Sequence, residues 1–369
     1  MNPPGTIKSL PLGSLIDGYL VRGFLRIFFS SLLVTTSLYM VVDFFDRIST
    51  FFDNATPVWT VIRYSIYNAP LAISRVIGFA TLFSTLLCLG TLTRTNEITA
   101  MRSCGISVQR IAFPLLLVSM LICLSTFFWN ETLVPLLFHQ AQTIYKIEIQ
   151  KKQQQSLFGT RDIWIRGQAS FINIGNFDPQ TNVLEHVTIF LINRDFGLRG
   201  LVEIPSARWN GHDWEAQEAT QWDILTDGKM VPGKATLPPA ISQTPDDLKL
   251  LAREPEEFSF FDLKKQISEM KAKGIDTASE EVDLQTKLAI PFISPLMVLL
   301  ATPFALKKQM SAGLALSFGA AMVVGFGYWV LTALCISLGH SGALPTPVAA
   351  WLPNTIFTLI GFFYFTAEE

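Results

Sequence analysis

The residues that could carry out chemistry are few in this chain. The stretch Gly228–Lys234 has the spacing GxxxxGK, in which glycines cradle nucleotide phosphates and the lysine contacts them. A phosphate-binding loop also needs Ser or Thr after the lysine to bind magnesium, whereas Ala235 follows here and Pro232 interrupts the loop. The surrounding segment also has a β-like pattern rather than a strand-to-helix one, so we expect no nucleotide site here.

Histidine and cysteine form no recognisable ligand set. The sequence lacks HExxH and GxSxG, and its cysteines form no CxxC pair. We therefore expect no metal site, no disulfide framework, no bound cofactor and no catalytic centre, so that any energy the protein uses must come from a partner. The residues in question are His139, His186, His212 and His340, with Cys88, Cys104, Cys123 and Cys335.

The composition is that of a membrane protein. Half of the 369 residues are hydrophobic and 16% are charged, whereas soluble domains carry about 25% charged residues. Mean hydropathy is +0.37 even though the middle of the chain is polar. The net charge of -2 comes with no basic block, which argues against a nucleic-acid partner.

Six apolar runs are long enough to cross a bilayer as helices, which takes about 20 residues each. Three runs precede a long polar segment and three follow it. The first run is too long for a signal-peptide core and no cleavage site follows it, so we expect it to be retained. The runs are 27–42 extended by Phe44 and Phe45, 76–92 with a lead-in from residue 64, 111–128, 288–306, 312–338 and 348–365.

Basic residues indicate the orientation, because short cytoplasmic loops are enriched in Lys and Arg. The short loops on one side carry only Arg47 and Arg63. We therefore expect both termini to be cytoplasmic and the polar insert to lie outside, in the periplasm of a Gram-negative cell. The basic residues on the expected cytoplasmic side are Lys8, Arg22, Arg26, Arg94, Arg102, Arg110, Lys307 and Lys308.

The polar insert has the pattern of short strands. Apolar and polar residues alternate, or β-branched residues gather, between turn signals such as Asn210–Asp213, which predicts an antiparallel sandwich or roll. The later segment 262–273 instead has helical spacing, and Gly274 is a suitable stop. The expected strands lie at 162–166, 170–174, 183–192, 201–209 and 214–225.

The expected architecture is a mixed membrane protein with six transmembrane helices, three plus three, and an inserted antiparallel β domain. We expect residues 1–134 to hold three helices, 135–282 to form the outer domain with its return helix, and 283–369 to hold three more helices.

The loop between the second and third runs, Thr93–Ser107, predicts a short amphipathic helix at about 94–105. Asn96 and Glu97 lie in its first turn, where an acidic side chain suits the helix dipole, and Gly105 can end it. The helix is either a docking element for a cytoplasmic partner or a solvated connector with basic residues. The residues alone leave both interpretations open.

A resemblance to a known family favours docking. The run Asn96-Glu97 followed by Met101, Gly105 and Ser107 resembles the coupling-helix signature of the LptF/LptG permease family of lipopolysaccharide export. The likeness extends over nearly the whole chain, because the three-plus-three layout with its insert is also that family's plan. Lys287 before Pro291 and the pair Leu352-Pro353 also match the family. Asp43 and Asp46, at the end of the first span, look more like the LptG branch.

This resemblance implies a set of partners. A pair of permeases, LptF-like and LptG-like, would sit on an LptB-like ATPase homodimer that uses ATP and magnesium. Glu97 would enter a groove of that ATPase and pair with a basic residue, while Arg94 and Arg102 would add contacts or simply anchor the loop. LptC-like and LptA-like periplasmic proteins would receive the lipid, and the outer domain would be a β-jellyroll.

The implied substrate is lipopolysaccharide, with anionic phosphates and several acyl chains, so its site needs an apolar cavity with a basic rim. Arg75 and Lys287 lie 19 and 20 residues from Arg94 and Lys307. At 1.5 Å per residue this places them about 28–30 Å from the cytoplasmic boundary, at the outer headgroup level. Arg63 and Lys146 would lie just above them. The alternative is that these side chains snorkel to ordinary headgroups.

In the family the first span of one subunit and the fifth of its partner form lateral gates. That places Phe44, Phe45, Gly325, Phe326 and Gly327 at an expected gate, although static packing explains the glycines equally well. Two other functions remain open: a MacB/FtsX-like permease for lipoprotein release or mechanotransmission, and a membrane scaffold or sensor that transports nothing. The first would place its outer domain after the first span rather than after the third.

Overall fold

The computed structural model describes residues 12–150, 163–166, 170–178, 181–192, 197–216, 218–224, 230–232, 244–245, 248, 255–272, 277–306 and 314–367. Within these ranges six helices are long and apolar enough to cross a membrane. Three precede the inserted sheet and three follow it, which confirms the predicted fold class. They are Leu15–Asp46, Val58–Arg94, Val108–Ile149, Ala278–Leu306, Met322–His340 and Thr346–Phe365. Lys307, Lys308 and the first two residues of the fifth run lie outside the described residues.

Helix α3 (Val58–Arg94) is the centre of the bundle. It packs against α1 (Leu12–Asp46), α5 (Val108–Thr143), α9 (Ile293–Leu306) and α10 (Leu314–His340). Thr81, Ser84 and Thr85 are fully buried in α3, and each hydroxyl donates to the carbonyl four residues earlier. Small polar side chains that satisfy their own hydrogen bonds let neighbouring helices approach closely.

Helix α1 lies at the edge of the bundle. Only 6% of its most apolar window is buried, against 61% for α3. Phe24 and Phe28 face the core, while Phe29, Leu33 and Leu38 are exposed. In a membrane protein such a face contacts lipid or another subunit.

The fourth span is interrupted. Helix α8 (Ala278–Ala289) is followed by a 3-10 turn, η4 (Ile290–Phe292), before α9 begins. Pro291 has no N–H to donate, which accounts for the break. Helices α5 and α8 run across the expected domain boundaries at 134/135 and 282/283, because each continues as a more polar helix beyond its apolar stretch.

A buried polar link joins the last three spans. The Tyr328 hydroxyl donates to Asn354 Oδ1 at 2.6 Å, and Asn354 Nδ2 donates to the Ala289 carbonyl at 2.9 Å. Asn354 belongs to α11 (Thr346–Ala367), so α10, α11 and the end of α8 share one network. The Ala289 carbonyl, two residues before Pro291, therefore has a hydrogen-bond partner at the point where the helix breaks.

The insert contains one antiparallel sheet in the order β1-β2-β3-β4-β6-β7, with β5 also paired to β4. Ile174, Leu184, Ile189 and Ile204 fill its buried face, and Leu248 packs on the same cluster. Asn210 Oδ1 accepts from the backbone N–H groups of His212 and Asp213, which forms the predicted turn. The strands are β1 (Ile163–Arg166), β2 (Ser170–Asp178), β3 (Val183–Ile192), β4 (Leu198–Trp209), β5 (Trp214–Ala216), β6 (Thr220–Ile224) and β7 (Met230–Pro232).

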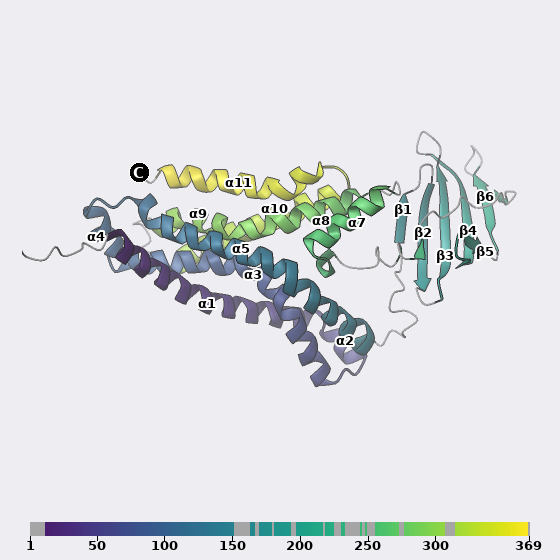
Figure 1. The fold of residues 1–369 in the computed structure, drawn as a ribbon, viewed down its shortest axis with the longest axis horizontal. Coiled ribbons are helices and arrows are strands. Elements are labelled where there is room, and N and C mark those ends of the chain that lie inside the picture. Colours follow the sequence, from purple (N-terminus) through teal and green to yellow (C-terminus); the bar gives the residue numbers. More distant parts are fainter. Residues whose placement is uncertain are drawn as a thin grey trace, which may run out of the picture.

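The sheet lies at one end of the helix bundle (Figure 1). The chain returns from it through η3 (Pro255–Glu257) and α7 (Phe260–Ala272), which coincides closely with the expected helix at 262–273. Residue 273 itself lies outside the described part of the chain. At the far end of the bundle lie α4 (Glu97–Ser103) and the end of α11 (Figure 1).

We predict that Gly78→Ala destabilises the bundle. A Cβ at Gly78 would lie 2.5–3.1 Å from three side-chain atoms of Ile293, so α3 and α9 must move apart at a cost of about 1–3 kcal/mol. Gly90→Ala is the matched control, because nothing lies within 4 Å of its Cβ position and alanine favours helix. The thermal unfolding midpoint of the purified protein in detergent should fall for the first variant and not for the second. Equal unfolding midpoints for the two variants would contradict the close contact between Gly78 and Ile293.

Candidate functional site

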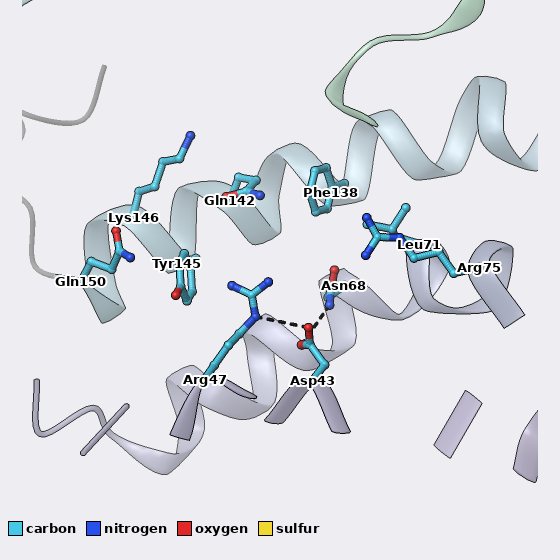
Figure 2. Close-up of a pocket in the computed structure, with 10 residues that line it drawn as sticks. All are labelled: Asp43, Arg47, Asn68, Leu71, Arg75, Phe138, Gln142, Tyr145, Lys146 and Gln150. Atoms are coloured by element: carbon cyan, nitrogen blue, oxygen red, sulfur yellow. Dashed lines mark hydrogen bonds and ion pairs between the residues drawn. The ribbon is translucent and has the colours of Figure 1, made fainter. Parts of the chain in front are cut away.

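A cavity of about 250 Å³ lies among α1, α3, α5 and the π-helical turn η1 (Ile144–Ile149). Figure 2 shows Arg47, Arg75 and Phe138 around it, whereas the ammonium end of Lys146 points away from Arg47. Three of its lining residues are cations and one is a carboxylate, so the cavity has an excess of positive charge. The lining residues are Asp43, Arg47, Asn68, Leu71, Arg75, Phe138, Gln142, Tyr145, Lys146 and Gln150.

Arg47 is fixed at one side of the cavity. Its Nε lies 3.2 Å from Asp43 Oδ1, and Asn68 donates to the other carboxylate oxygen at 3.3 Å. The guanidinium also lies over the ring of Tyr145, 4.6 Å from its centroid, and 5.5 Å from that of Tyr64. Contacts with a carboxylate and two aromatic faces hold a partly buried guanidinium in one orientation.

Arg75 lies at the other side of the cavity, one turn after Leu71. One terminal nitrogen donates to the Tyr39 hydroxyl at 2.8 Å, and the other lies 3.1 Å from a carboxylate oxygen of Glu256. Its side chain is 48% exposed. The guanidinium therefore faces the cavity and, at the same time, the segment that returns from the sheet.

The structure brings two of the four expected rim residues, Arg75 and Lys146, to the cavity. Lys287 lies outside the lining set, and its Nζ donates to the Phe258 carbonyl at 3.0 Å. Arg63 also lies outside it and pairs with Glu148 at 3.3 Å in a half-exposed contact. Arg75 and Lys287 both contact residues 256–258, so they lie at the same end of the bundle.

Sequence reasoning missed Arg47 as a site residue. It entered only the count of basic residues in outer loops, although it follows Asp43 by four positions, the spacing of an ion pair on one helical face. The stacking on Tyr64 and Tyr145 has no signal in the sequence, because those residues come from α3 and η1.

Helix α4 is seated on the bundle by apolar contacts. Ile98 is buried in the helix core, and Met101 and Ile106 pack against the same cluster. Asn96 before the helix and Gly105 after it have positive φ, and Gly105 N–H and Ile106 N–H bond to the carbonyls of Arg102 and Met101. A glycine in this left-handed conformation ends a helix without steric cost.

Glu97 is held at the start of α4. Its carboxylate accepts from the Tyr19 hydroxyl at 2.9 Å and from the Thr95 hydroxyl at 2.8 Å. Arg94 and Arg102 are exposed, and neither forms an ion pair with the residues that the structure describes. At the same end of the bundle Arg110 makes a two-pronged contact with Asp17, with both N–O distances at 2.8 Å. One acidic group and two exposed basic groups thus lie on or beside a short, rigid helix.

The structure places the expected gate residues in different surroundings. Phe45 and Phe326 are exposed, at 61% each, and the Phe44 ring contacts the Phe45 ring edge-to-face and the Phe51 ring at a tilt. Gly325 instead lies against α3, where an added Cβ would meet the ring of Phe79 at 2.9 Å. Gly327 is open, with the Phe357 ring 4.0 Å from its Cβ position. Gly325 therefore serves packing within this chain.

Six spans, an inserted sheet and a positively charged cavity define a polytopic membrane protein suited to an anionic amphiphile. The profile of the family described as "Lipopolysaccharide export system permease LptF/LptG" matches residues 18–367. The chain belongs to this family. It is accordingly a lipopolysaccharide export permease, the non-catalytic membrane subunit of an ABC transporter of the inner membrane, without a bound cofactor.

Two curated proteins are similar to the chain. Both are named "Lipopolysaccharide export system permease protein LptG", one from Escherichia coli strain K12 and the other from Escherichia coli O6:H1 strain CFT073. Each is 22% identical over 362 residues, which covers 95% of this chain and 97% of that protein. The likeness thus extends through the helices and the inserted sheet alike.

We predict that Arg47→Ala costs more stability than Arg63→Ala. Removing Arg47 leaves the Asp43 carboxylate, whose side chain is 18% exposed, without its ion pair, a loss of about 1–3 kcal/mol. The Arg63–Glu148 pair is half exposed, so its loss should cost less than about 1 kcal/mol. Thermal unfolding in detergent compares the two, and Asp43→Ala combined with Arg47→Ala should cost less than the sum of the single changes. Additive costs would show that the pair is not coupled.

Proposed function

We propose that this chain is the LptG-like member of a heterodimer with an LptF-like permease, mounted on an LptB-like ATPase homodimer. The names of the two similar proteins and the pair Asp43 and Asp46 support the LptG branch. Family membership implies partners of the lipopolysaccharide export complex in general. The exposed apolar face of α1 supports a second membrane subunit, because it leaves a large surface for another helix bundle.

The proposed topology places both termini and α4 in the cytoplasm and the sheet in the periplasm. Lys and Arg gather at the expected cytoplasmic ends of the spans, which supports this orientation. The separation of α4 and the end of α11 from the sheet is consistent with it (Figure 1). Residues 1–134 and 283–369 then form the membrane unit, and 135–282 the outer unit with the ends of α5 and α8.

The cavity is the proposed entry site for lipopolysaccharide. Phosphate groups need cations, and the cavity offers Arg47, Arg75 and Lys146 beside the apolar side chains of Leu71 and Phe138. The single observation that carries the proposal is this basic cavity in a chain whose family match extends over residues 18–367. Phe44, Phe45 and Phe326 would line the lateral gate through which the acyl chains pass.

Helix α4 is the proposed link to the ATPase. It connects α3 to α5 in the chain, so a force on α4 would be transmitted along these two helices, which line the cavity at their other end. ATP-driven closure of the LptB-like dimer would move α4, collapse the cavity and push the lipid toward the sheet. LptC-like and LptA-like proteins would then receive it.

We predict that Glu97→Ala uncouples ATP hydrolysis from export while the protein still inserts. The variant removes the acidic group proposed to pair with the ATPase, so lipid release per ATP hydrolysed should fall by at least an order of magnitude in reconstituted vesicles. Tyr19→Phe is the matched control, because it removes a hydrogen bond to Glu97 but leaves the carboxylate. If both variants lose export equally, Glu97 acts by bracing α4 against α1 rather than by contact with a partner.

We also predict the composition of the purified complex. After co-expression with the host's ATPases, native mass spectrometry should find two ATPase subunits, a second six-span permease and bound lipopolysaccharide. A homodimer with neither ATPase nor lipid would instead favour a scaffold or sensor that transports nothing. A single-permease complex with a lipoprotein would favour the lipoprotein-release alternative.

A further inference from the structure

The residues Pro255–Phe258, here called the strap, contact both cations that the sequence placed at the outer headgroup level. Glu256 pairs with Arg75 on α3 at 3.1 Å, and the Phe258 carbonyl accepts from Lys287 on α8 at 3.0 Å. A third contact joins Glu257 to His139 on α5 at 3.0 Å. One acidic segment therefore spans three helices at the rim of the cavity.

Arg75 is the group shared by the strap and the cavity. Its two terminal nitrogens are both engaged, one by the Tyr39 hydroxyl and the other by the Glu256 carboxylate. The guanidinium has five N–H donors, so a phosphate that binds it in the two-pronged manner uses donors next to the one that Glu256 holds, where the two anions repel each other. The negatively charged Glu256 is the group that a phosphate would displace, because both anions seek the same cation.

The Arg75–Glu256 pair is suited to exchange. The two side chains are 48% and 36% exposed, so water screens their attraction and the contact is weak. Glu257 is different, since its side chain is 4% exposed and its partner His139 does not line the cavity. Adjacent carboxylates of one segment thus have different roles, one exchangeable and one fixed.

The strap is also attached to α7. The Phe258 side chain is buried against Leu263 and Ile267, and Glu131 accepts from the first N–H of α7, at Phe260, at 2.7 Å. In chain order the strap follows the sheet and precedes α7. Release of Glu256 therefore loosens the point where the chain returns from the sheet to the bundle.

We infer that Glu256 is an internal competitor of the anionic lipid. Its carboxylate neutralises Arg75 while no lipid phosphate is present, and a lipid phosphate replaces it at the same guanidinium and frees this end of the strap. The inference rests on the proposed lipid cavity and adds to it a residue that sets affinity for phosphorylated against phosphate-free lipid.

The test uses the complete transporter in detergent with two probes, lipid A bearing both phosphates and the same lipid with its phosphates removed. Glu256→Gln should bind the phosphorylated lipid about 2- to 5-fold more tightly, the factor expected for loss of a half-exposed competing ion pair. Its affinity for the phosphate-free lipid should not change. Glu257→Gln is the matched control and should leave both affinities unchanged. In an Arg75→Gln background the Glu256→Gln effect should disappear.

Hydrogen exchange provides a readout that needs no substitution. Phosphorylated lipid should raise amide exchange in a peptide that covers residues 255–262, whereas phosphate-free lipid should not. Unchanged exchange of this peptide in the presence of phosphorylated lipid would overturn the inference, as would an unchanged affinity in Glu256→Gln.

Different outcomes would contradict the phosphate site in the cavity and the competition by Glu256. If the wild-type complex binds both lipids equally, the basic cavity is not the phosphate site and the strap inference falls with it. If the wild type prefers the phosphorylated lipid but Glu256→Gln leaves that preference unchanged, the cavity stands and the strap inference is wrong.

Discussion

Charge next to hydrocarbon must be paired or hydrogen-bonded, and the end of this bundle near the sheet is organised around that constraint. Arg47, Arg75 and Lys287 each find a partner on a different element: Asp43 and two aromatic rings, Tyr39 and Glu256, and the Phe258 carbonyl. These contacts connect α1, α3, η1, α8 and the strap. The cations needed to attract an anionic lipid are thus the same groups that hold the helices and the returning chain together.

The two ends of the bundle are held together by different kinds of contact. At the end near the sheet, polar contacts of modest strength surround a cavity and can be exchanged for those of a ligand. At the opposite end, α4 is seated by Ile98, Met101 and Ile106 in the main core, and Arg110 is clamped to Asp17. An element proposed to transmit force needs such a firm seat, because a loose helix would absorb the motion rather than pass it to α3 and α5.

The middle of the bundle allows helices to lie close together. Gly78 against Ile293 and Gly325 against Phe79 permit α9 and α10 to approach α3, while buried hydroxyls bond within their own helix. Helix α1 contributes Leu20, Phe24 and Phe28 to the main core, whereas its opposite apolar face is exposed and is left for lipid or for a second subunit.

The sequence by itself determined the six spans, the inserted antiparallel strands and the short helix near Glu97. Those features depend on local periodicity, on apolar length and on turn residues such as Gly105, all of which are written in neighbouring positions. Only the tertiary structure decided which charges meet. Arg47 looked like one more loop cation, and the pairing of Arg75 with Glu256 joins residues 181 positions apart. Such contacts depend on how α3, α5 and the returning strap are placed in space, and no local pattern records that placement.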